Sequence, residues 1–133
     1  MGESRGDLEA AYRATDYRVE DAPGGPFVIR VGEVCDRLDG EWAFVTACNP
    51  GSNPVSDVEN ARRMAELEAT VREGGRTYYH GHGVGRDGRW PAEPSLLILG
   101  ITEPQARALA ERLGQNAIVV GRTGERARLV WTG

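Results

Sequence analysis

A segment of amide and hydroxyl side chains at the start of a helix is the part of the chain best suited to bind a small molecule. An apolar run ends just before residue 49, and a helix is predicted to begin at residue 56. Such a turn directs free backbone N–H groups and the positive end of the helix dipole outward. We therefore predict binding of a small anionic or amide-bearing ligand here. The candidate ligand-binding residues in this part of the chain are Asn49, Ser52, Ser56, Asn60 and Arg63.

The same residues also have a purely structural interpretation. Asn and Ser are frequent turn residues, so Asn49 and Ser52 could only terminate a strand. Ser56 could only cap the helix. Asn60 is not needed for the cap, and it lies where its side chain can reach a ligand at the helix start.

Glu93 is the best candidate for a functional acid. It lies between two prolines in the string WPAEPS at residues 90–95, and prolines restrict the backbone on both sides of the carboxylate. A structural alternative is that Glu93 accepts hydrogen bonds from the helix start or pairs with an arginine.

The two histidines are the other candidates for acid–base chemistry. His80 could act as acid or base near neutral pH, with Glu93 orienting it. His80 and His82 share one face if they lie on a strand, a geometry that metals use. No spacing in the sequence indicates a third ligand, so we predict neither a metal site nor a cofactor.

Further polar residues lie in two segments distant from the helix start. They complete the set of candidate ligand-binding residues, which adds Arg86, Arg89, Glu93, Ser95, Gln115 and Asn116.

Composition narrows the class of protein. The 133 residues carry a net charge of -4, with a pI near 5.2, which argues against a nucleic-acid-binding protein. All 16 basic residues are arginine, so Schiff-base chemistry by a lysine is excluded. No apolar run is long enough for a membrane span and no signal peptide is evident, so we predict a soluble cytoplasmic protein. The length fits a single domain over residues 1–133.

Hydrophobic periodicity predicts a mixed α+β fold. Capping signals predict helices over 56–73 and 103–113, and a shorter helix is expected over 7–14. Expected strands cover residues 17–20, 27–31, 42–48, 76–80, 95–101, 117–121 and 127–132, with a hairpin turn at 23–26.

The order of these elements predicts a ferredoxin-like βαββαβ core. Its antiparallel sheet would carry both long helices on one face, with an N-terminal helix and hairpin and an extra C-terminal strand. The strands 42–48 and 95–101 should be central, adjacent and antiparallel. In this topology the turn 49–60, the loop 80–95 and residues 115–116 meet at one edge of the sheet.

Several strings in the chain resemble one family of small proteins. They are YRATDY at residues 12–17, FVTACNPGS at 44–52 followed by Glu59 and Asn60, DGRWPAEPS at 87–95 and GQNA at 114–117. Together they resemble the domain-of-unknown-function 3293 family. The resemblance implies a small, soluble bacterial protein, and it implies no activity.

Three functional hypotheses follow. The first is a binding domain that holds a small anionic or amide-bearing ligand between the turn 49–60, the loop 86–95 and residues 115–116. The second is a small hydrolase or transferase with Glu93 or His80 as acid or base. The third is a homodimeric interaction module that pairs through a free sheet edge.

Overall fold

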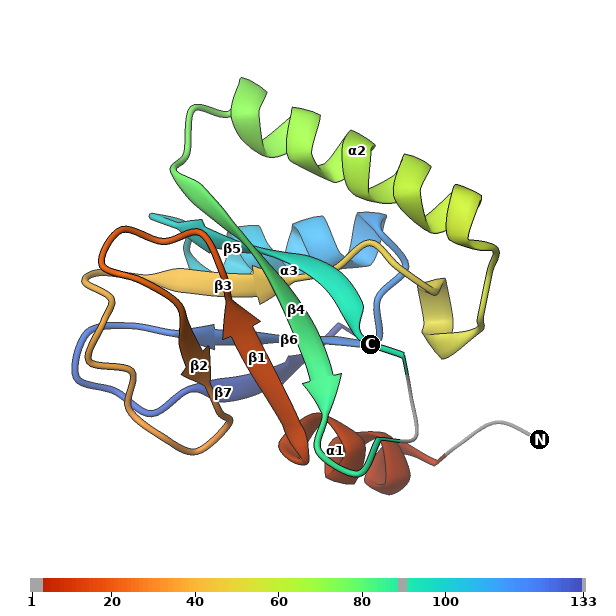
Figure 1. The fold of residues 1–133 in the computed structure, drawn as a ribbon, viewed down its shortest axis with the longest axis horizontal. Helices are drawn as coiled ribbons and strands as arrows, with labels where there is room; N and C mark the ends of the chain where they lie inside the picture. The colour runs from red at the N-terminus through yellow and green to blue at the C-terminus, as the bar shows by residue number, and fades with distance from the viewer. Residues whose placement is uncertain (1–3, 89–90, 133) are drawn as a thin grey trace.

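The computed structural model describes residues 4–88 and 91–132, which form three α-helices and one seven-stranded antiparallel sheet (Figure 1). The helices are α1 (Arg5–Arg13), α2 (Asp57–Glu73) and α3 (Glu103–Arg112), with a short 3-10 helix η1 (Pro50–Ser52). The strands are β1 (Thr15–Val19), β2 (Phe27–Ile29), β3 (Trp42–Val45), β4 (Tyr78–Gly85), β5 (Glu93–Leu99), β6 (Ala117–Gly121) and β7 (Arg128–Trp131). The predicted α+β class is confirmed.

The strands are ordered β2-β1-β4-β5-β3-β6-β7. β3 and β5 are adjacent and antiparallel, with Trp42 opposite Leu99 and Val45 opposite Leu96. β5 is the central strand and β3 lies next to it, in a sheet whose two ends are the predicted N-terminal hairpin and the predicted extra C-terminal strand. The predicted pairing of these two strands is confirmed.

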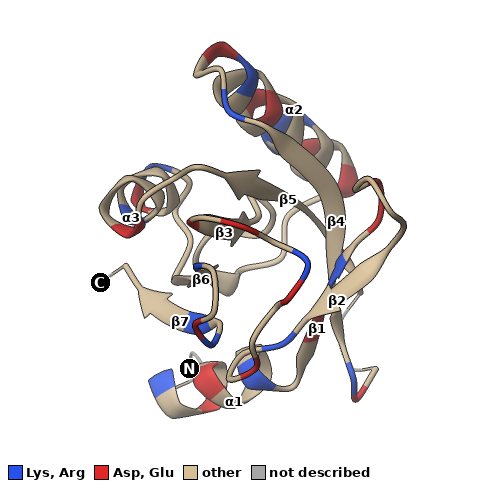
Figure 2. Ribbon diagram, turned by 90° about the vertical axis from the view of Figure 1, so that its left-hand side faces the viewer, with Lys and Arg blue, Asp and Glu red and all other residues tan. Residues whose placement is uncertain are grey.

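The two long helices cover the same face of the sheet. Leu67 of α2 and Ala106 of α3 pack in one core with Val45, Ile98 and Val120 of three strands. Ser56 caps α2, and Thr102 forms a capping box at the start of α3, as the sequence predicts. Charged residues occur along the ribbons of both helices (Figure 2). No helix in the described ranges is long and apolar enough to cross a membrane.

The opposite face of the sheet curls around a second core. Its buried residues include Tyr17, Trp42, Phe44, Leu97 and Val119, from four different strands. The curl brings the two edges of the sheet close to each other. The backbone N–H of Gly32, after β2, donates to the carbonyl of Ala127, before β7, at 2.8 Å. This core is therefore enclosed along both edges.

Helix α1 covers one open end of the curled sheet (Figure 1). Ser4 caps it in a capping box. Its last turn accepts three hydrogen bonds at backbone carbonyls. From β1, Thr15 Oγ1 donates to Ala11 and Tyr17 Oη to Tyr12, and Arg86 Nη2, just after β4, donates to Arg13. The helix begins at Arg5, two residues before the predicted start.

Two strand boundaries differ from the prediction. β3 ends at Val45 and not at residue 48, because its register places Ala47 opposite Pro94, which has no N–H to donate. β4 continues to Gly85, well beyond the predicted end at residue 80. Glycines at 81, 83 and 85 look like a loop in sequence, but in this sheet they continue the ladder with β1 and β5.

Candidate functional site

A cavity of about 190 Å³ lies between helix α1 and the end of the curled sheet. At this end β1 and β5 begin and β4 ends, as their antiparallel order requires. Most of the wall is apolar and includes Leu8, Tyr12, Tyr17, Phe44 and Val119. Most polar residues of the wall come from the three segments that were predicted to meet, and Thr15 and Thr46 are the others.

Three hydrogen bonds join these polar segments. Asn49 Nδ2 donates to Glu93 Oε2 at 2.7 Å, which connects the turn after β3 to the start of β5. Gln115 Nε2 donates to the carbonyl of Cys48 at 2.9 Å, and Asn116 Nδ2 donates to Ser52 Oγ at 2.8 Å. The predicted meeting of the turn 49–60, the β4–β5 region and residues 115–116 is therefore present.

Asn49 is held in one orientation by its neighbours. Its φ of 48° lies in the left-handed region, which asparagine tolerates better than most residues. Its backbone N–H donates to Asn60 Oδ1 at 2.9 Å, and its Oδ1 accepts from Asn60 Nδ2 at 2.9 Å and from the Val55 N–H at 3.1 Å. With its oxygen occupied in this way, Asn49 presents its Nδ2 to Glu93.

Burial controls the acidity of Glu93. Removal from water raises the pKa of the Glu93 carboxyl above its usual range, and the hydrogen bond from Asn49 lowers it only in part. Among the described residues, Asn49 is the one hydrogen-bond donor to this carboxylate. Glu93 therefore combines a perturbed pKa with an oxygen that accepts no hydrogen bond from any described residue, and perturbed pKa values are typical of functional sites.

The aromatic wall remains uncharged at neutral pH. Burial, together with the negative charge of Glu93, raises the pKa of Tyr12 to about 12. Burial also raises the pKa of Tyr17, which packs edge-to-face on Phe44 with ring centroids 5.2 Å apart. Both phenols therefore present neutral surface to the cavity.

A glycine separates the aromatic wall from the acid. In the sheet register Gly83 of β4 lies between Tyr17 of β1 and Glu93 of β5. All three line the cavity, so the phenol and the carboxyl stand on either side of a position without a side chain. Gly83 therefore leaves open the space that a larger residue would fill.

Five of the predicted ligand-binding residues line this cavity, and they are Asn49, Ser52, Glu93, Ser95 and Gln115. Ser95 and Gln115 are the two buried polar residues among the described residues, with exposures of 4% and 7%. Ser52 also has a left-handed backbone, with a φ of 65°. These five residues form one polar wall that faces the aromatic residues.

The other predicted residues have structural contacts outside the cavity. Ser56 caps α2, and Asn60 holds Asn49. Arg63 donates to the carbonyl of Ala47 at 2.6 Å and to that of Leu113 at 2.5 Å. Arg86 donates to the last turn of α1 and Asn116 to Ser52, while Arg89 lies outside the described residues.

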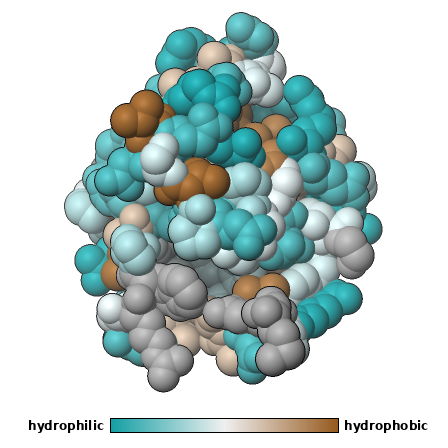
Figure 3. Space-filling view, turned by 90° about the vertical axis from the view of Figure 1, so that its right-hand side faces the viewer, coloured by the Kyte–Doolittle hydropathy of each residue, from teal (hydrophilic) through white to brown (hydrophobic). Residues whose placement is uncertain are grey.

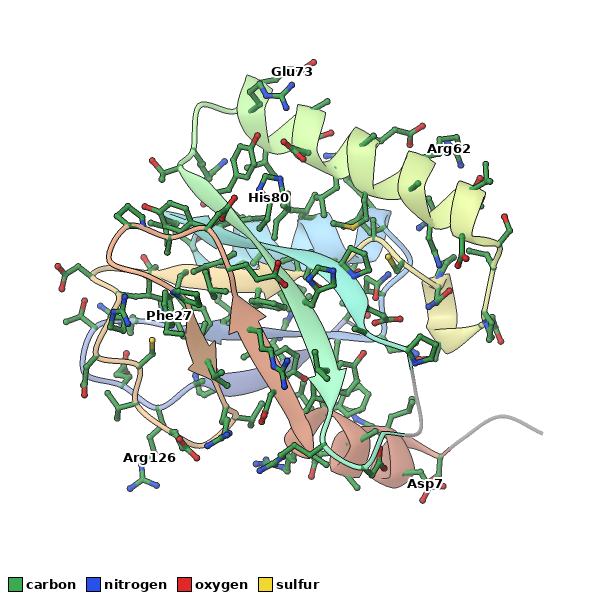
Figure 4. All side chains as sticks on the ribbon, viewed as in Figure 1. Asp7, Phe27, Arg62, Glu73, His80 and Arg126 are labelled. Atoms are coloured by element: carbon green, nitrogen blue, oxygen red, sulfur yellow. The ribbon has the colours of Figure 1, made fainter. Side chains whose placement is uncertain are left out.

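His80 lies on the other face of the sheet from Glu93. It points from β4 toward α2 (Figure 4), where Nδ1 contacts Asp21 at 2.6 Å and Nε2 contacts Glu68 at 3.0 Å. These carboxylates raise the pKa of His80. The expected pairing of His80 with Glu93 does not occur, because alternate residues of a strand point to opposite faces. His82 pairs with Glu20, and no cluster of three metal-binding side chains occurs in the described ranges.

The helix over residues 7–14 was predicted, but neither this helix nor the aromatic wall was assigned to the site. Tyr12 and Tyr17 lie in its YRATDY string but were not assigned to a site. One sequence signal could have indicated a role for Gly83. Glycine occupies every second position, 81, 83 and 85, directly after the predicted strand 76–80. Such spacing removes the side chains from one face of a strand, which allows a ligand or another chain segment to approach its backbone.

Comparison with known proteins identifies the family. The model of the family described as "Protein of unknown function (DUF3293)" matches residues 45–118, more than half of the chain, and the chain belongs to this family. No curated protein and no solved structure matches the chain. The matched residues include the whole polar wall and exclude helix α1.

Proposed function

We propose that this DUF3293 protein binds a small molecule with an apolar body and an amide or amine group that donates a hydrogen bond to Glu93. The observation that carries the proposal is a carboxylate on the wall of a mostly apolar cavity, with Asn49 as its one described protein donor. Apolar pockets with a few fixed polar groups are the usual form of small-molecule sites. The polar group sets the orientation of the ligand, and the apolar wall supplies contact area.

The charge of the cavity favours an amide-bearing ligand over the anionic alternative. The charged residues among its described lining residues are Asp87 and Glu93, both acidic. Arg63 and Arg86, which were expected to attract an anion, donate to backbone carbonyls elsewhere. A carboxylate ligand placed next to Glu93 would therefore meet like charge, whereas an amide or ammonium group would meet an acceptor.

The energetics of Glu93 also support a role in binding. A carboxyl whose pKa is raised by burial is less stable as an anion in the folded protein than in the unfolded chain. Its contribution to stability is therefore greatest at low pH and falls as the pH rises through the folded pKa. A residue kept at a cost in stability is a candidate for function.

A hydrolase or transferase with Glu93 as general acid or base is the second candidate. The raised pKa of Glu93 supports it, since a carboxyl that titrates closer to neutral pH can both donate and accept a proton. His80 has no part in this version, because its partners are Asp21 and Glu68.

The homodimer hypothesis has less support. The edge strands β2 and β7 have three and four residues, and hydrogen bonds between the segments beside them shorten the free edge. The face in Figure 3 is mostly hydrophilic, with small separate hydrophobic patches. Long, flat, apolar edges are the ones that pair between chains.

For the fold, we infer that β3, β4, β5 and β6 with α2 and α3 form a ferredoxin-like core. The order β4-β5-β3-β6 and the position of both helices on one face support this inference.

A set of three matched ligands tests the proposed function. Pentanamide, pentylamine and pentanoate share an apolar chain and differ in the head group. Titrated into the ¹⁵N-labelled protein at pH 7, the amide and the amine should shift the backbone N–H signals of Gly83, Ser95 and Ala117, which surround the cavity. Pentanoate should not, because its charge repels Glu93.

The ligand set can also contradict the proposal. If pentanoate binds as tightly as pentanamide, Glu93 does not act as the acceptor for the ligand. If neither the amide nor the amine shifts these signals, the proposed class of ligand is wrong.

A further inference from the structure

We propose that the ligand group next to Glu93 is planar, an aromatic ring or a similar flat ring that carries the amide or amine and lies against the backbone of Gly83. The inference rests on the proposed function and names the class of its ligand. Three observations carry it: the register around Gly83, the space above it and the size of the cavity.

The register places the flat group between two fixed side chains. Gly83 pairs with Tyr17 on one side and with Glu93 on the other. A group above Gly83 therefore has the phenol ring as one neighbour and the carboxylate as the other. A ring with an attached donor can meet both at once, with its face or edge on Tyr17 and its donor on Glu93.

The space above Gly83 is open, and this distinguishes it from the neighbouring glycine. A methyl group at Gly81 would come within 2.1 Å of the Arg18 carbonyl oxygen, so that position is closed by packing. A methyl group at Gly83 would meet Thr15 Cγ2 at 3.7 Å and Tyr17 Cδ1 at 3.8 Å, which are ordinary contacts. Packing of the protein itself therefore does not require glycine at residue 83. Close contact between a ligand and the backbone would explain why residue 83 is glycine.

The surrounding residues and the volume favour one flat ring. α1 and the residue after it contribute the small side chains Ala11 and Ala14 to the cavity, and β4 contributes Gly83 and Gly85. The volume of about 190 Å³ is below the roughly 300–1,000 Å³ of sites for drug-sized ligands. A single ring with one substituent matches this size.

Two amides that differ in the shape of the ring test the inference. Benzamide and cyclohexanecarboxamide have the same head group and the same number of carbons, but only benzamide has a flat ring. We expect benzamide to bind the wild-type protein at least tenfold more tightly in the ¹⁵N titration. Equal affinities, or tighter binding of cyclohexanecarboxamide, would overturn the planar class.

Substitution of Gly83 by alanine tests the contact itself. The added methyl group should reduce the affinity for benzamide at least tenfold, because it occupies the surface on which the ring lies. The melting temperature should be unchanged or higher, since the methyl group makes no clash and alanine is favoured over glycine in a strand. Unchanged affinity in a folded Gly83→Ala protein would overturn the inference.

A matched control and the pentanamide titration separate the possible failures. Gly74→Ala, at the end of α2, adds a methyl group at 3.5 Å from its neighbours and should leave benzamide binding unchanged. If pentanamide binds but benzamide shows no preference over cyclohexanecarboxamide, the planar class is overturned and the proposed function stands. If neither pentanamide nor benzamide binds, the proposed function is overturned as well.

Discussion

Replacement of Arg63 by alanine will lower the free energy of unfolding by about 2–3 kcal/mol, because hydrogen bonds from a charged donor contribute about 1.5–3 kcal/mol. Its guanidinium group donates to the carbonyl of Ala47, just after β3, and to that of Leu113, at the end of α3. These two carbonyls lie next to the Cys48–Asn49 and Gly114–Gln115 segments of the polar wall. Denaturant unfolding measured by circular dichroism gives the difference directly.

Arg62 provides a matched control on the next position of α2. Its guanidinium group pairs with Glu59 and Glu66 on the exposed side of the helix, and it points away from the sheet in Figure 4. Arg62→Ala should change stability little, because exposed ion pairs contribute little. Arg63→Lys should be intermediate, since an ammonium group cannot reproduce the two-carbonyl geometry of guanidinium. Equal effects of Arg62→Ala and Arg63→Ala would contradict the structural role of Arg63.

Replacement of Asn49 by aspartate will make stability depend strongly on pH. Aspartate tolerates the left-handed backbone and can still accept from Asn60 and Val55 through one oxygen. Its other oxygen would face Glu93 Oε2, where Asn49 Nδ2 now donates at 2.7 Å. Two carboxylates at this distance cannot both ionise easily, so the pair would share a proton, with one pKa strongly raised.

The sign of the pH effect follows from the raised pKa. The folded variant would bind more protons than the unfolded chain, so its stability would fall as the pH rises through the folded pKa. Each pKa unit corresponds to about 1.4 kcal/mol, and we expect a loss on the order of 2 kcal/mol at pH 8 relative to pH 4, beyond that of the wild type. Denaturant unfolding at several pH values measures it. Parallel stability profiles for Asn49→Asp and wild type would show that Asn49 does not face an ionised Glu93.

The sequence predicted the elements that local signals define. Capping boxes and proline fixed the start of α3, and Ser56 fixed the start of α2. The order of strands and helices predicted the β3–β5 pairing, and this pairing brought Asn49 and Glu93 together. The polar half of the site was therefore accessible from sequence order and turn chemistry.

The apolar half depends on the curl of the sheet. The contact of residues 32–34 with 126–127 joins segments about ninety residues apart in sequence, and no local pattern predicts it. Without that curl, α1 has no defined neighbour and Tyr12 and Tyr17 cannot be assigned to a common wall. The prediction of a loop at the glycines of β4 was also wrong. Glycine is typical of loops, whereas here Gly83 leaves space on one face of a strand, and that space is visible only in the folded sheet.

The roles of Arg63 and His80 were beyond sequence reasoning for a related cause. A charged side chain near a predicted ligand site can serve the ligand or the backbone, and only the position of the carbonyls decides. The register of β4 with β5 decides whether His80 points to the same face of the sheet as Glu93, and the sequence alone does not give this register.

Substitution of Glu93 by glutamine separates the contribution of the carboxylate to binding from its contribution to the fold. Glutamine can still accept from Asn49 Nδ2 through its Oε1, and its NH₂ group would then face the ligand where the wild type presents an acceptor. Because burial raises the pKa of Glu93 and so disfavours the ionised carboxylate in the folded protein, the neutral glutamine should be at least as stable as the wild-type side chain at pH 8. A folded variant is therefore expected, and any loss of binding can be assigned to the lost acceptor.

The most direct test of Glu93 as the ligand acceptor is a titration of pentanamide into the ¹⁵N-labelled wild type and Glu93→Gln proteins at pH 8. The structure predicts that the substitution weakens binding at least tenfold, which is about 1.4 kcal/mol, while the variant stays folded. Equal affinity of the two proteins for pentanamide would contradict the proposed role of Glu93.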